Sequence, residues 1–501
     1  MSRRGVPLLN FFGVVSPTFV SRVNNHGSMF TKVFFASCAL MAASSCGAAG
    51  WPFDEKAYAL ATRYCTSCHG EGLTGARAPA LSRGSLQRAQ SQAEIESVIK
   101  NGIAENGMPA FRNTLSNVQI ASLARLITSI RDFGETQARR AIASFEHKVF
   151  DTELEKFSVE VVASGLEVPW SFAFLPDGGI LVTERPGRLR VVNHGSVADP
   201  IAGTPDVWAR QDGGLLAMTL HPDYEDNGWI YLSFAQPGAD YGTSMTRIVR
   251  GRIKDGRWVD QQDVWSPDRA DFVESNIHFG SRLLFVEGKL VFSIGDRGRR
   301  GDAQLTSNPF GKIFRVNEDG STPKDNPFAH RGDALGSIWT YGHRNPQGLA
   351  RDPRTGLLWA TEHGPKGGDE LNVLHKGANY GWPVVTHGVD DDGSIISEKT
   401  SHVGMQDPAA FWTPSISPAP IAFYTGSQFP RWRHHMLLGS LTSQELRRVE
   451  IDGDRVVKQE VLFERLGRIR DIHTGPDGNV YIAIERFNNF GQLVRLVPAS
   501  K

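Results

Sequence analysis

Hydrophobic residues recur along the chain with two different periods, and the change falls near residue 157. Before that point they return every three or four residues, which places them on one face of a helix. One such face precedes residue 65, and another follows Ser116, a residue type suited to the N-cap of a helix. The two faces are formed by Phe53, Ala57, Leu60 and Tyr64, and by Ile120, Leu123, Ile127 and Ile130. This pattern predicts a small all-α domain.

From residue 157 on, short apolar and β-branched runs follow turn sequences such as Pro176-Asp177-Gly178-Gly179. The runs recur at uneven spacings of about 40 to 80 residues, as blades with loops of different length would. They cover residues 180–183, 229–233, 289–293, 357–361, 436–440 and 480–483. We predict an all-β six-bladed β-propeller. A many-stranded sandwich is the alternative, but it does not account for the regular succession of turn, strand and polar residue.

Several of these runs are followed by Asp, Glu, His or Arg. Strand ends on one side of a propeller converge on its axis, so we expect a functional site there.

The first 50 residues have a third pattern. A charged start at Met29 leads into the apolar run 33–43 and then into small residues, which is the layout of an export signal. A short buried helix is the alternative. Met1 and Met29 are the two candidate starts, and Cys46 leaves an N-terminal lipid anchor open. We expect an exported, periplasmic protein that is soluble or lipid-anchored. The expected division is a leader over 1–50, a helical domain over 51–135, a linker over 136–156 and a propeller over 157–501.

Composition narrows the function. The 501 residues include 54 basic and 54 acidic side chains, so the excess positive charge of a nucleic-acid-binding protein is missing. Four cysteines are too few for a disulfide framework. Two of them lie in the leader and two in Cys65-Thr66-Ser67-Cys68-His69.

This last motif has the spacing by which Cys65 and Cys68 bind haem vinyl groups while His69 ligates the iron. A redox CxxC and half of a zinc site are the alternatives; a zinc site needs a second cysteine pair, which is absent beyond the leader. Met108, in Asn106-Gly107-Met108-Pro109, is the one methionine between the leader and residue 217, so we expect it to be the sixth ligand. The segment resembles a class I cytochrome c with haem c.

Long motifs of the second part resemble those of soluble quinoprotein sugar dehydrogenases, the aldose or glucose dehydrogenases that use pyrroloquinoline quinone (PQQ) and Ca²⁺. The motifs lie in the segments 311–327, 339–349, 361–372 and 377–383. The resemblance covers about residues 157–498 and implies a six-bladed propeller, in agreement with the repeat count.

The resemblance implies roles for individual residues. His278 matches the general base and Asp296 the acid that orients it. PQQ carries three carboxylates, which suits arginine partners, and a hard cation prefers oxygen ligands. The implied PQQ contacts are Arg344, Asn345, Arg468 and Arg470; the implied calcium ligands are the carbonyls of Gly364 and Pro365, with Glu370 and Tyr380 for a second calcium; and Trp412 is the implied aromatic face for a sugar ring, with a buried tryptophan as the alternative.

Three positions depart from the family pattern. Asp212, next to Gln211, stands where the family has glutamine, so either side chain is a candidate for the quinone contact. Thr442 replaces a cofactor lysine, which removes one positive charge. Ile277 replaces the acid that precedes the base in glucose dehydrogenases, which argues against a simple transfer of glucose specificity.

We therefore expect a quinohaemoprotein that oxidises an aldose sugar at C1 to a lactone and passes electrons through its haem to an external acceptor. The acceptor classes are a cytochrome, a copper protein or a quinone pathway. The alternatives are a dehydrogenase of a sorbosone-like aldehyde, and a non-catalytic propeller that binds carbohydrate while the haem senses redox state.

Overall fold

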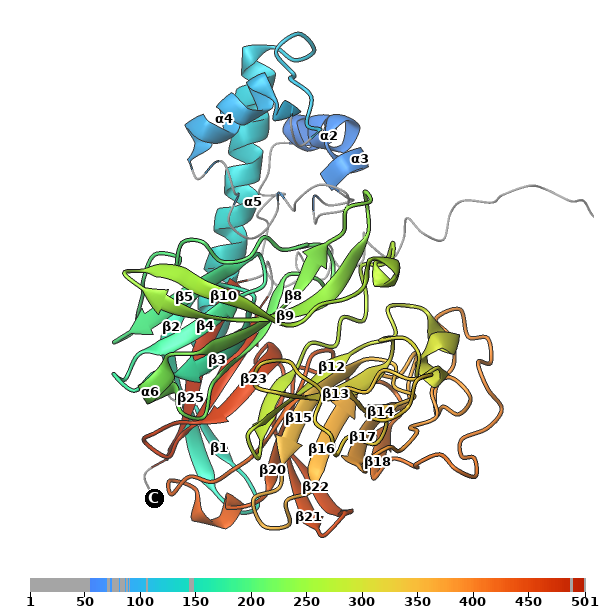
Figure 1. Ribbon diagram of the computed structural model, residues 1–501. Helices are drawn as coiled ribbons and strands as arrows, with labels where there is room; N and C mark the ends of the chain where they lie inside the picture. Colours follow the sequence, from blue (N-terminus) through green and yellow to red (C-terminus); the bar gives the residue numbers. More distant parts are fainter. Residues whose placement is uncertain are drawn as a thin grey trace, which may run out of the picture. The chain divides into compact units, whose positions relative to one another are not determined.

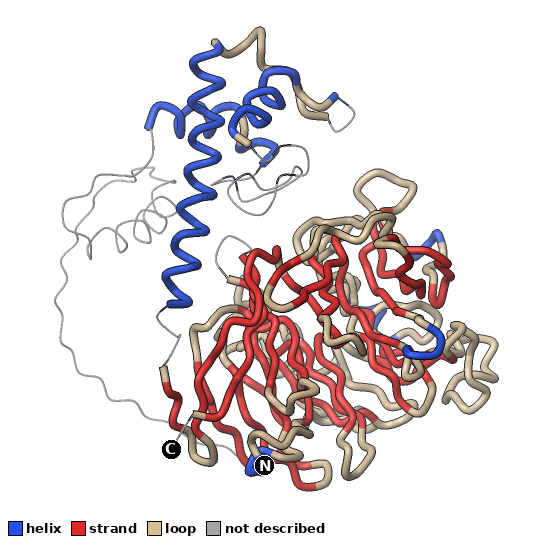
Figure 2. The backbone as a smooth tube through the Cα atoms, turned by 90° about the vertical axis from the view of Figure 1, so that its left-hand side faces the viewer, coloured by secondary structure: helices blue, strands red, loops and turns tan. Residues whose placement is uncertain are grey.

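The computed structural model describes residues 55–69, 73, 81, 86, 89, 91–104, 107–143, 148–486 and 490–499. The predicted leader, with Met1, Met29 and Cys46, lies outside these residues. The described part of the N-terminal region is helical, and the part from residue 149 is built of strands (Figure 2). None of the described helices has the length and apolarity that a membrane crossing requires.

The N-terminal helices form because each buries one apolar stripe. The helices are α2 (Glu55–Tyr64), α3 (Thr66–His69), α4 (Gln92–Asn101) and α5 (Asn117–Ala143). Helices α2 and α4 both pack against α5, which buries Ile120, Leu123 and Ile127. Ser116 caps α5 as predicted: its hydroxyl accepts from the backbone N–H of Gln119, whose side chain accepts from the backbone N–H of Ser116. Ser91 and Glu94 form the same reciprocal cap on α4.

The remainder is a six-bladed β-propeller, which confirms the predicted fold (Figure 1). Five sheets are four-stranded and the sixth is five-stranded. Blade 1 is β3 (Pro169–Phe174), β4 (Ile180–Glu184), β5 (Arg188–Asn193) and β6 (Ser196–Val197); blade 2 is β7 (Leu215–Leu220), β8 (Ile230–Pro237), β9 (Ser244–Lys254) and β10 (Arg257–Trp265). Blade 3 is β11 (Leu283–Val286), β12 (Lys289–Ile294), β13 (Lys312–Asn317) and β14 (Ile338–Tyr341).

Blade 4 is β15 (Pro346–Arg351), β16 (Leu358–Glu362), β17 (Asp369–Leu374) and β18 (Ala410–Trp412); blade 5 is β19 (Pro418–Phe423), β20 (Met436–Ser440), β21 (Leu446–Asp452) and β22 (Arg455–Phe463). Blade 6 combines β1 (Val149–Asp151) and β2 (Lys156–Glu167) with β23 (Arg468–Thr474), β24 (Val480–Glu485) and β25 (Phe490–Pro498). The connections carry α6 (Tyr224–Asn227) and the 3₁₀ turns η3 (Arg269–Asp271), η4 (Arg300–Gln304) and η5 (Pro430–Trp432).

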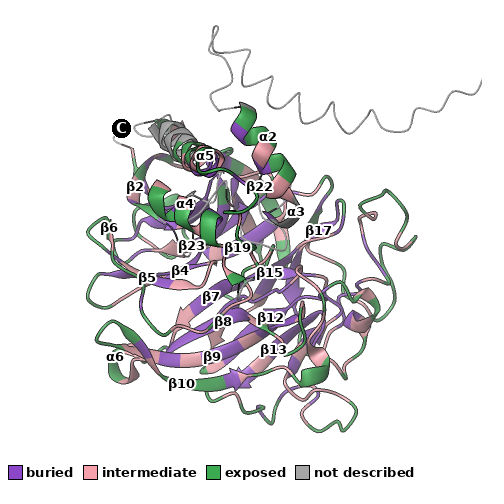
Figure 3. Cartoon of the chain, turned by 90° about the horizontal axis from the view of Figure 1, so that it is seen from above, coloured by how far each residue is buried: buried purple, intermediate pink, exposed green. Residues whose placement is uncertain are grey.

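The six runs recognised in the sequence are β4, β8, β12, β16, β20 and β24, the second strand of each blade. These strands are buried almost throughout, as in β4 and β24, where every residue is buried. Figure 3 shows the burial concentrated along the strands while the connecting loops are exposed. The second strand of a blade has a neighbouring strand on each side, and both of its faces are covered. Such a strand needs an unbroken apolar run, which explains why these six strands were the easiest to recognise in the sequence.

Two predicted boundaries differ from the observed elements. Helix α5 continues to Ala143, past the expected domain end at residue 135, and β1 lies inside the expected linker 136–156. Strand β1 belongs to blade 6 because it pairs with β2, and the ring of Phe150 stacks on that of Phe157 with centroids 5.1 Å apart. Strand β2 in turn pairs with β25, so the first and last parts of the propeller close one blade.

Candidate active site

His278 and Asp296 form a close pair in blade 3, where His278 precedes β11 and Asp296 follows β12. Nδ1 of His278 lies 2.6 Å from Oδ1 of Asp296. Oδ2 of the fully buried Asp296 accepts from the indole N–H of Trp382 at 2.8 Å. Burial alone would raise the pKa of Asp296, but the hydrogen bond and charge of His278, with the backbone N–H of Gly298, hold it below its ordinary value. An ionised Asp296 accepts a proton-bearing Nδ1, which leaves Nε2 as the basic nitrogen of His278.

The backbone of His278 is strained. Its φ of 57° lies in the left-handed region, which costs a non-glycine residue roughly 1–2 kcal/mol. The backbone N–H of His278 donates to Oδ2 of Asp212 at 3.3 Å. On its other side, a Cβ at Gly295 would lie 2.2 Å from the carbonyl oxygen of His278, so only glycine allows this approach. The strained conformation is therefore fixed from two sides, as is common at functional sites.

Arg297 secures the same turn from inside the protein. Its guanidinium donates to the carbonyls of Ile277 and Ser275, the latter at 2.5 Å, and lies 3.5 Å from the ring centroid of Phe279. Burial lowers the pKa of Arg297 to about 9. No local pattern indicates this role, because an arginine after a glycine turn looks like a surface charge.

Arg344 and Asn345 lie between β14 and β15 and reach toward blades 3 and 4. The backbone N–H of Arg344 donates to Glu362 at 2.7 Å, and its Nη1 donates to the carbonyl of Gly364 at 2.8 Å. Burial lowers the pKa of Arg344. Oδ1 of Asn345 accepts from the backbone N–H of Gly280 at 3.1 Å, which joins this turn to that of His278. Nε of Arg344 is buried and has no hydrogen-bond partner among the described residues.

His363 follows β16 and was assigned no role from the sequence, although it lies in a motif that carried the resemblance. Its backbone N–H donates to the carbonyl of Asn345 at 3.2 Å, and its carbonyl accepts from Nη1 of Arg344 at 3.3 Å. Burial lowers its pKa to about 3, and the positive charges of Arg344, His278, Arg470 and Arg468 add to this effect. Its imidazole is therefore neutral.

Arg468 and Arg470, on β23, reach the same carboxylate, that of Glu485 on β24. Nε of Arg470 donates to Oε2 of Glu485 at 2.7 Å, and Nε of Arg468 lies 3.5 Å from the same oxygen. Burial would raise the pKa of Glu485, but the charges of Arg470, Arg185 and Arg468 outweigh it and lower the pKa to about 2. Both arginines thus reach one carboxylate, although the pairing of β23 with β24 is irregular between Ile469 and Asp471, and Glu485 neutralises part of their charge.

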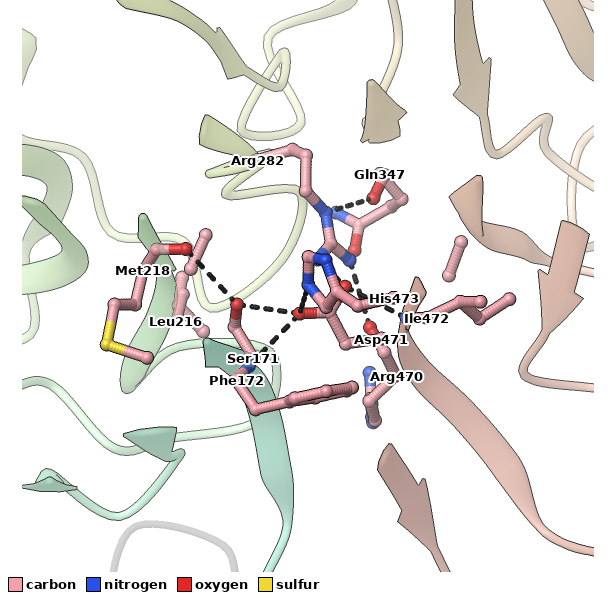
Figure 4. A network of polar contacts seen from close by, with 12 residues as sticks. Ser171, Phe172, Leu216, Met218, Arg282, Gln347, Arg470, Asp471, Ile472 and His473 are labelled. Carbon is pink, nitrogen blue, oxygen red and sulfur yellow. Dashed lines mark hydrogen bonds and ion pairs between the residues drawn. The ribbon is translucent and has the colours of Figure 1, made fainter. Parts of the chain in front are cut away.

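A second buried network supports Arg470 where the innermost strands meet (Figure 4). Arg282 donates to Oδ1 of Asp471 at 3.0 Å, to the carbonyl of Arg470 at 3.0 Å and to the carbonyl of Gln347 at 2.9 Å. Oδ2 of Asp471 accepts from the hydroxyl of Ser171 at 2.7 Å. Burial would raise the pKa of Asp471, but its partners, led by His473 and Arg282, lower it to about 2. These contacts join blades 1, 3, 4 and 6.

Thr442 stands where the family has a lysine. It follows β20 and is linked to the Gly364 turn through Ser417 and Asp369. Its hydroxyl lies 2.6 Å from that of Ser417, and the backbone N–H of Ser417 donates to Asp369 at 2.7 Å. Oδ1 of Asp369 accepts from the backbone N–H of Gly364 at 2.9 Å. Thr442 is therefore two side chains away from the Gly364 turn.

The candidate calcium ligands consist mainly of backbone oxygens. No group of three or more His, Cys, Asp or Glu side chains among the described residues is arranged to hold a metal ion. The carbonyl of Gly364 faces the guanidinium of Arg344. Glu370 lies opposite Glu362 in the β16–β17 pairing, and burial together with Glu362 raises its pKa well above the ordinary value. The hydroxyl of Tyr380 is already bound to the backbone of Val373 and His375, which leaves its carbonyl as the ligand.

One sequence-based assignment changes. Trp412 does not offer a face to a sugar: it is 8% exposed, packs in the core between blades, and donates to Oε1 of Gln459 at 3.1 Å. Alternation along β18 turns the neighbouring Phe411 outward instead, so the alternative of a buried tryptophan is correct. Asp212 contacts the backbone of His278, as described above, whereas Gln211 is exposed with a φ of 48°.

In the N-terminal domain, the helix that precedes the haem-binding motif contacts the segment that follows Met108. His69, at the end of α3, is 8% exposed, and Met108 forms a β-bridge with Ile103 in a tight loop. A Cβ at Gly102 would lie 2.6 Å from the carbonyl of Met108, so glycine permits this loop. The ring of Tyr64, next to Cys65, contacts that of Phe111, three residues after Met108, with centroids 6.1 Å apart. Nothing is described of the side chain of Cys68.

The arrangement combines a histidine oriented by a buried carboxylate with a cluster of positive charge. Buried polar atoms without a hydrogen-bond partner mark the cluster: Nε of Arg344 and Nε2 of His363 are both unpartnered among the described residues. Buried polar atoms are rarely left without a partner, so these two indicate a ligand with acceptor oxygens.

Comparison with known proteins gives two family matches. Residues 166–495 match the family model described as glucose/sorbosone dehydrogenase. Residues 54–127 match the model described as cytochrome c oxidase, cbb3-type, subunit III.

Individual relatives agree with these matches. Aldose sugar dehydrogenase YliI of Escherichia coli is 38% identical over 349 residues, covering 68% of this chain and 93% of the relative. Quinoprotein glucose dehydrogenase B of Acinetobacter calcoaceticus is 27% identical over 463 residues, covering 75% and 94%. The PQQ-bound structure of an aldose sugar dehydrogenase from Streptomyces coelicolor superposes with a TM-score of 0.56 at 27% identity, covering 68% of this chain and 99% of that one.

Proposed function

The chain belongs to the glucose/sorbosone dehydrogenase family, with a cytochrome c domain ahead of its propeller, and we propose that it oxidises an aldose sugar at C1 to the lactone and delivers the electrons through its own haem to an external acceptor. The observation that carries the proposal is the His278–Asp296 pair set beside a buried cluster of arginines. A non-catalytic carbohydrate-binding propeller would have no use for a carboxylate buried against this histidine.

In the proposed reaction, Nε2 of His278 takes the proton of the anomeric hydroxyl. Asp296 keeps the proton on Nδ1 and stabilises the imidazolium that forms, because the two groups lie 2.6 Å apart and Asp296 is shielded from water. Trp382 and Gly298 hold the carboxylate, while Asp212 and Arg297 hold the backbone that carries His278. Each of these contacts keeps the base in place without touching the substrate.

PQQ with calcium is the cofactor that the site accommodates. Its oxygens would be held by Arg344, Asn345, Arg468 and Arg470. Arginine suits this role because one planar guanidinium can donate two parallel hydrogen bonds to one carboxylate. The unpartnered Nε of Arg344 supports this fit. When bound, the quinone supplies the electrophile that accepts hydride from C1.

Calcium would be held by the carbonyls of Gly364 and Pro365. The guanidinium of Arg344 now hydrogen-bonds to the first of these carbonyls. Calcium and the guanidinium of Arg344 would thus share one carbonyl oxygen, whose negative partial charge would offset part of the repulsion between the two cations. Glu370 and the carbonyl of Tyr380 are proposed for a second calcium, since a cation would stabilise the facing carboxylates of Glu370 and Glu362.

Haem c would be bound covalently by Cys65 and Cys68, with His69 and Met108 as iron ligands. Because the haem domain is fused to the propeller, the haem that accepts electrons would be held at high effective concentration near the cofactor that donates them. The export-signal pattern and a covalently held haem both suit a periplasmic protein, which is the proposed location. The sugar is identified only by class, because the residue before the base is Ile277 rather than the acid of glucose dehydrogenases.

The test uses the purified full-length chain with and without Ca²⁺ and PQQ. We expect sugars from an aldose panel to reduce the haem, followed by absorbance, only when both are present. His278→Ala should abolish this reduction, while His330→Ala, at an exposed histidine, should leave it intact. Bound PQQ with no haem reduction by any sugar or aldehyde would refute the proposal.

A further inference from the structure

His363 has a buried ring nitrogen with no partner. Its Nε2 makes no hydrogen bond within the described residues, although the adjacent backbone is fully engaged with Asn345 and Arg344. Leaving a buried polar atom unpaired costs about 1–3 kcal/mol. A ligand that binds next to His363 and pairs with Nε2 would remove this cost.

The surroundings of His363 define what that partner is. The charged groups that act on its ring most strongly are Arg344, His278, Arg470 and Arg468, all of them cationic or capable of becoming so. Guanidinium groups only donate hydrogen bonds, so none of the three arginines can accept from Nε2 in the tautomer that carries its proton there. The missing partner has to bring its own acceptor atoms, and an anionic ligand is what such a set of neighbours attracts.

We propose that His363 is a further cofactor-binding residue, whose buried Nε2–H donates to an oxygen of PQQ. This inference rests on the proposed function and extends it to a residue outside the implied binding set.

The contact has a particular value in this chain. Thr442 supplies no charge where the family has lysine, and Glu485 neutralises part of the charge of Arg468 and Arg470. An uncharged hydrogen bond from His363 strengthens cofactor binding in a way that salt does not screen. The affinity for PQQ should therefore fall less at high ionic strength than it would if charged groups alone held the cofactor.

The test measures PQQ binding to the full-length protein at saturating Ca²⁺, by quenching of tryptophan fluorescence. His363→Leu removes the donor and keeps an apolar side chain of similar bulk, and His363→Gln retains an N–H at similar reach. We expect His363→Leu to weaken PQQ binding about 10- to 100-fold at both low and high salt, and His363→Gln to stay within about threefold of the wild type. His330→Leu is the matched surface control.

Two results would overturn the inference. His363→Leu that binds PQQ as tightly as the wild type would show that Nε2 makes no contact with it. Equal losses in the Leu and Gln variants would show that the ring acts by its shape rather than as a donor. Wild-type protein that fails to bind PQQ overturns the proposed function as well, so the two failures are distinguishable. Thermal unfolding of each variant checks that the propeller is intact.

Discussion

Replacing Asp296 by asparagine tests the central feature of the site. The substitution keeps the shape of the side chain and one acceptor oxygen, which can serve Gly298 at the position of Oδ1 or Trp382 at the position of Oδ2, but not both. It removes the negative charge that faces Nδ1 of His278 at 2.6 Å. The charge matters most when His278 has taken a proton, so the loss should fall on kcat and leave PQQ affinity nearly unchanged.

The size of the effect follows from the separation and burial of the two groups. Opposite unit charges about 4 Å apart attract by roughly 4 kcal/mol at an effective dielectric constant of about 20. An asparagine amide recovers a small part of this as a dipole. A loss of about 3–4 kcal/mol corresponds to a fall in kcat of about 100- to 1,000-fold.

Stopped-flow reduction of the haem by a saturating sugar measures kcat, and fluorescence titration measures PQQ binding. Asp302→Asn is a matched control, because Asp302 lies in the same connection but pairs with Arg299. It should stay within about twofold of the wild type. Asp296→Asn with kcat within about threefold of the wild type, and with PQQ bound, would refute the role of this carboxylate.

Four further outcomes are expected. The pKa of Glu485 is lowered from 4.5 to about 2, so its stabilising effect is complete above pH 4.5 and is lost as the pH falls toward 2; Glu485→Gln should remove about 3 kcal/mol of this acid sensitivity, measured by urea unfolding from pH 2 to 6. Thr442→Lys should tighten PQQ binding about tenfold at low salt and less at high salt, by fluorescence titration. Asp212→Ala should lower kcat about tenfold at unchanged PQQ affinity, and Asp212→Asn, which keeps an acceptor for the N–H of His278, should retain most of it. Met108→His should lower the midpoint potential of the haem in a spectroelectrochemical titration, because imidazole replaces a thioether that favours reduced iron.

Each of these outcomes has a clear opposite. Unfolding of Glu485→Gln with the wild-type pH dependence would show that Glu485 is not held ionised. Salt-independent tightening by Thr442→Lys would exclude a charge effect. Weaker PQQ binding in Asp212→Ala would show that Asp212 contacts the cofactor. An unshifted haem midpoint potential in Met108→His would exclude Met108 as an iron ligand.

The sequence predicted the blades because burial on both faces demands continuous apolar runs. Strands β4 and β24 show this directly, whereas β1, with only three residues and one stacked phenylalanine, looks like part of a linker. The pairing of β2 with β25 is a contact between distant segments, and no local pattern announces it.

The family resemblance predicted a site that contains His278, Asp296 and the arginines, and the structure pairs the first two residues with each other. Trp412 shows the limit: an aromatic residue on a short strand faces either the core or solvent, and one residue of register decides between them. His363 shows another, because a histidine between a strand and a glycine turn is noticed only when its neighbours in space are known. Glu485 lies at the end of a recognised run, but its partners Arg468 and Arg470 come from a different strand.

The closure of blade 6 sets the order in which the parts of this chain can fold. The ion pair between Glu160 and Arg495 joins residues 335 positions apart, so the ring can be completed only after almost the whole propeller has been synthesised. The contacts of α2 and α4 with α5, by contrast, all lie within residues 55–143. Helices with such local contacts fold quickly, while distant strand pairing is slow. The N-terminal helices can therefore form while the ring of blades is still open.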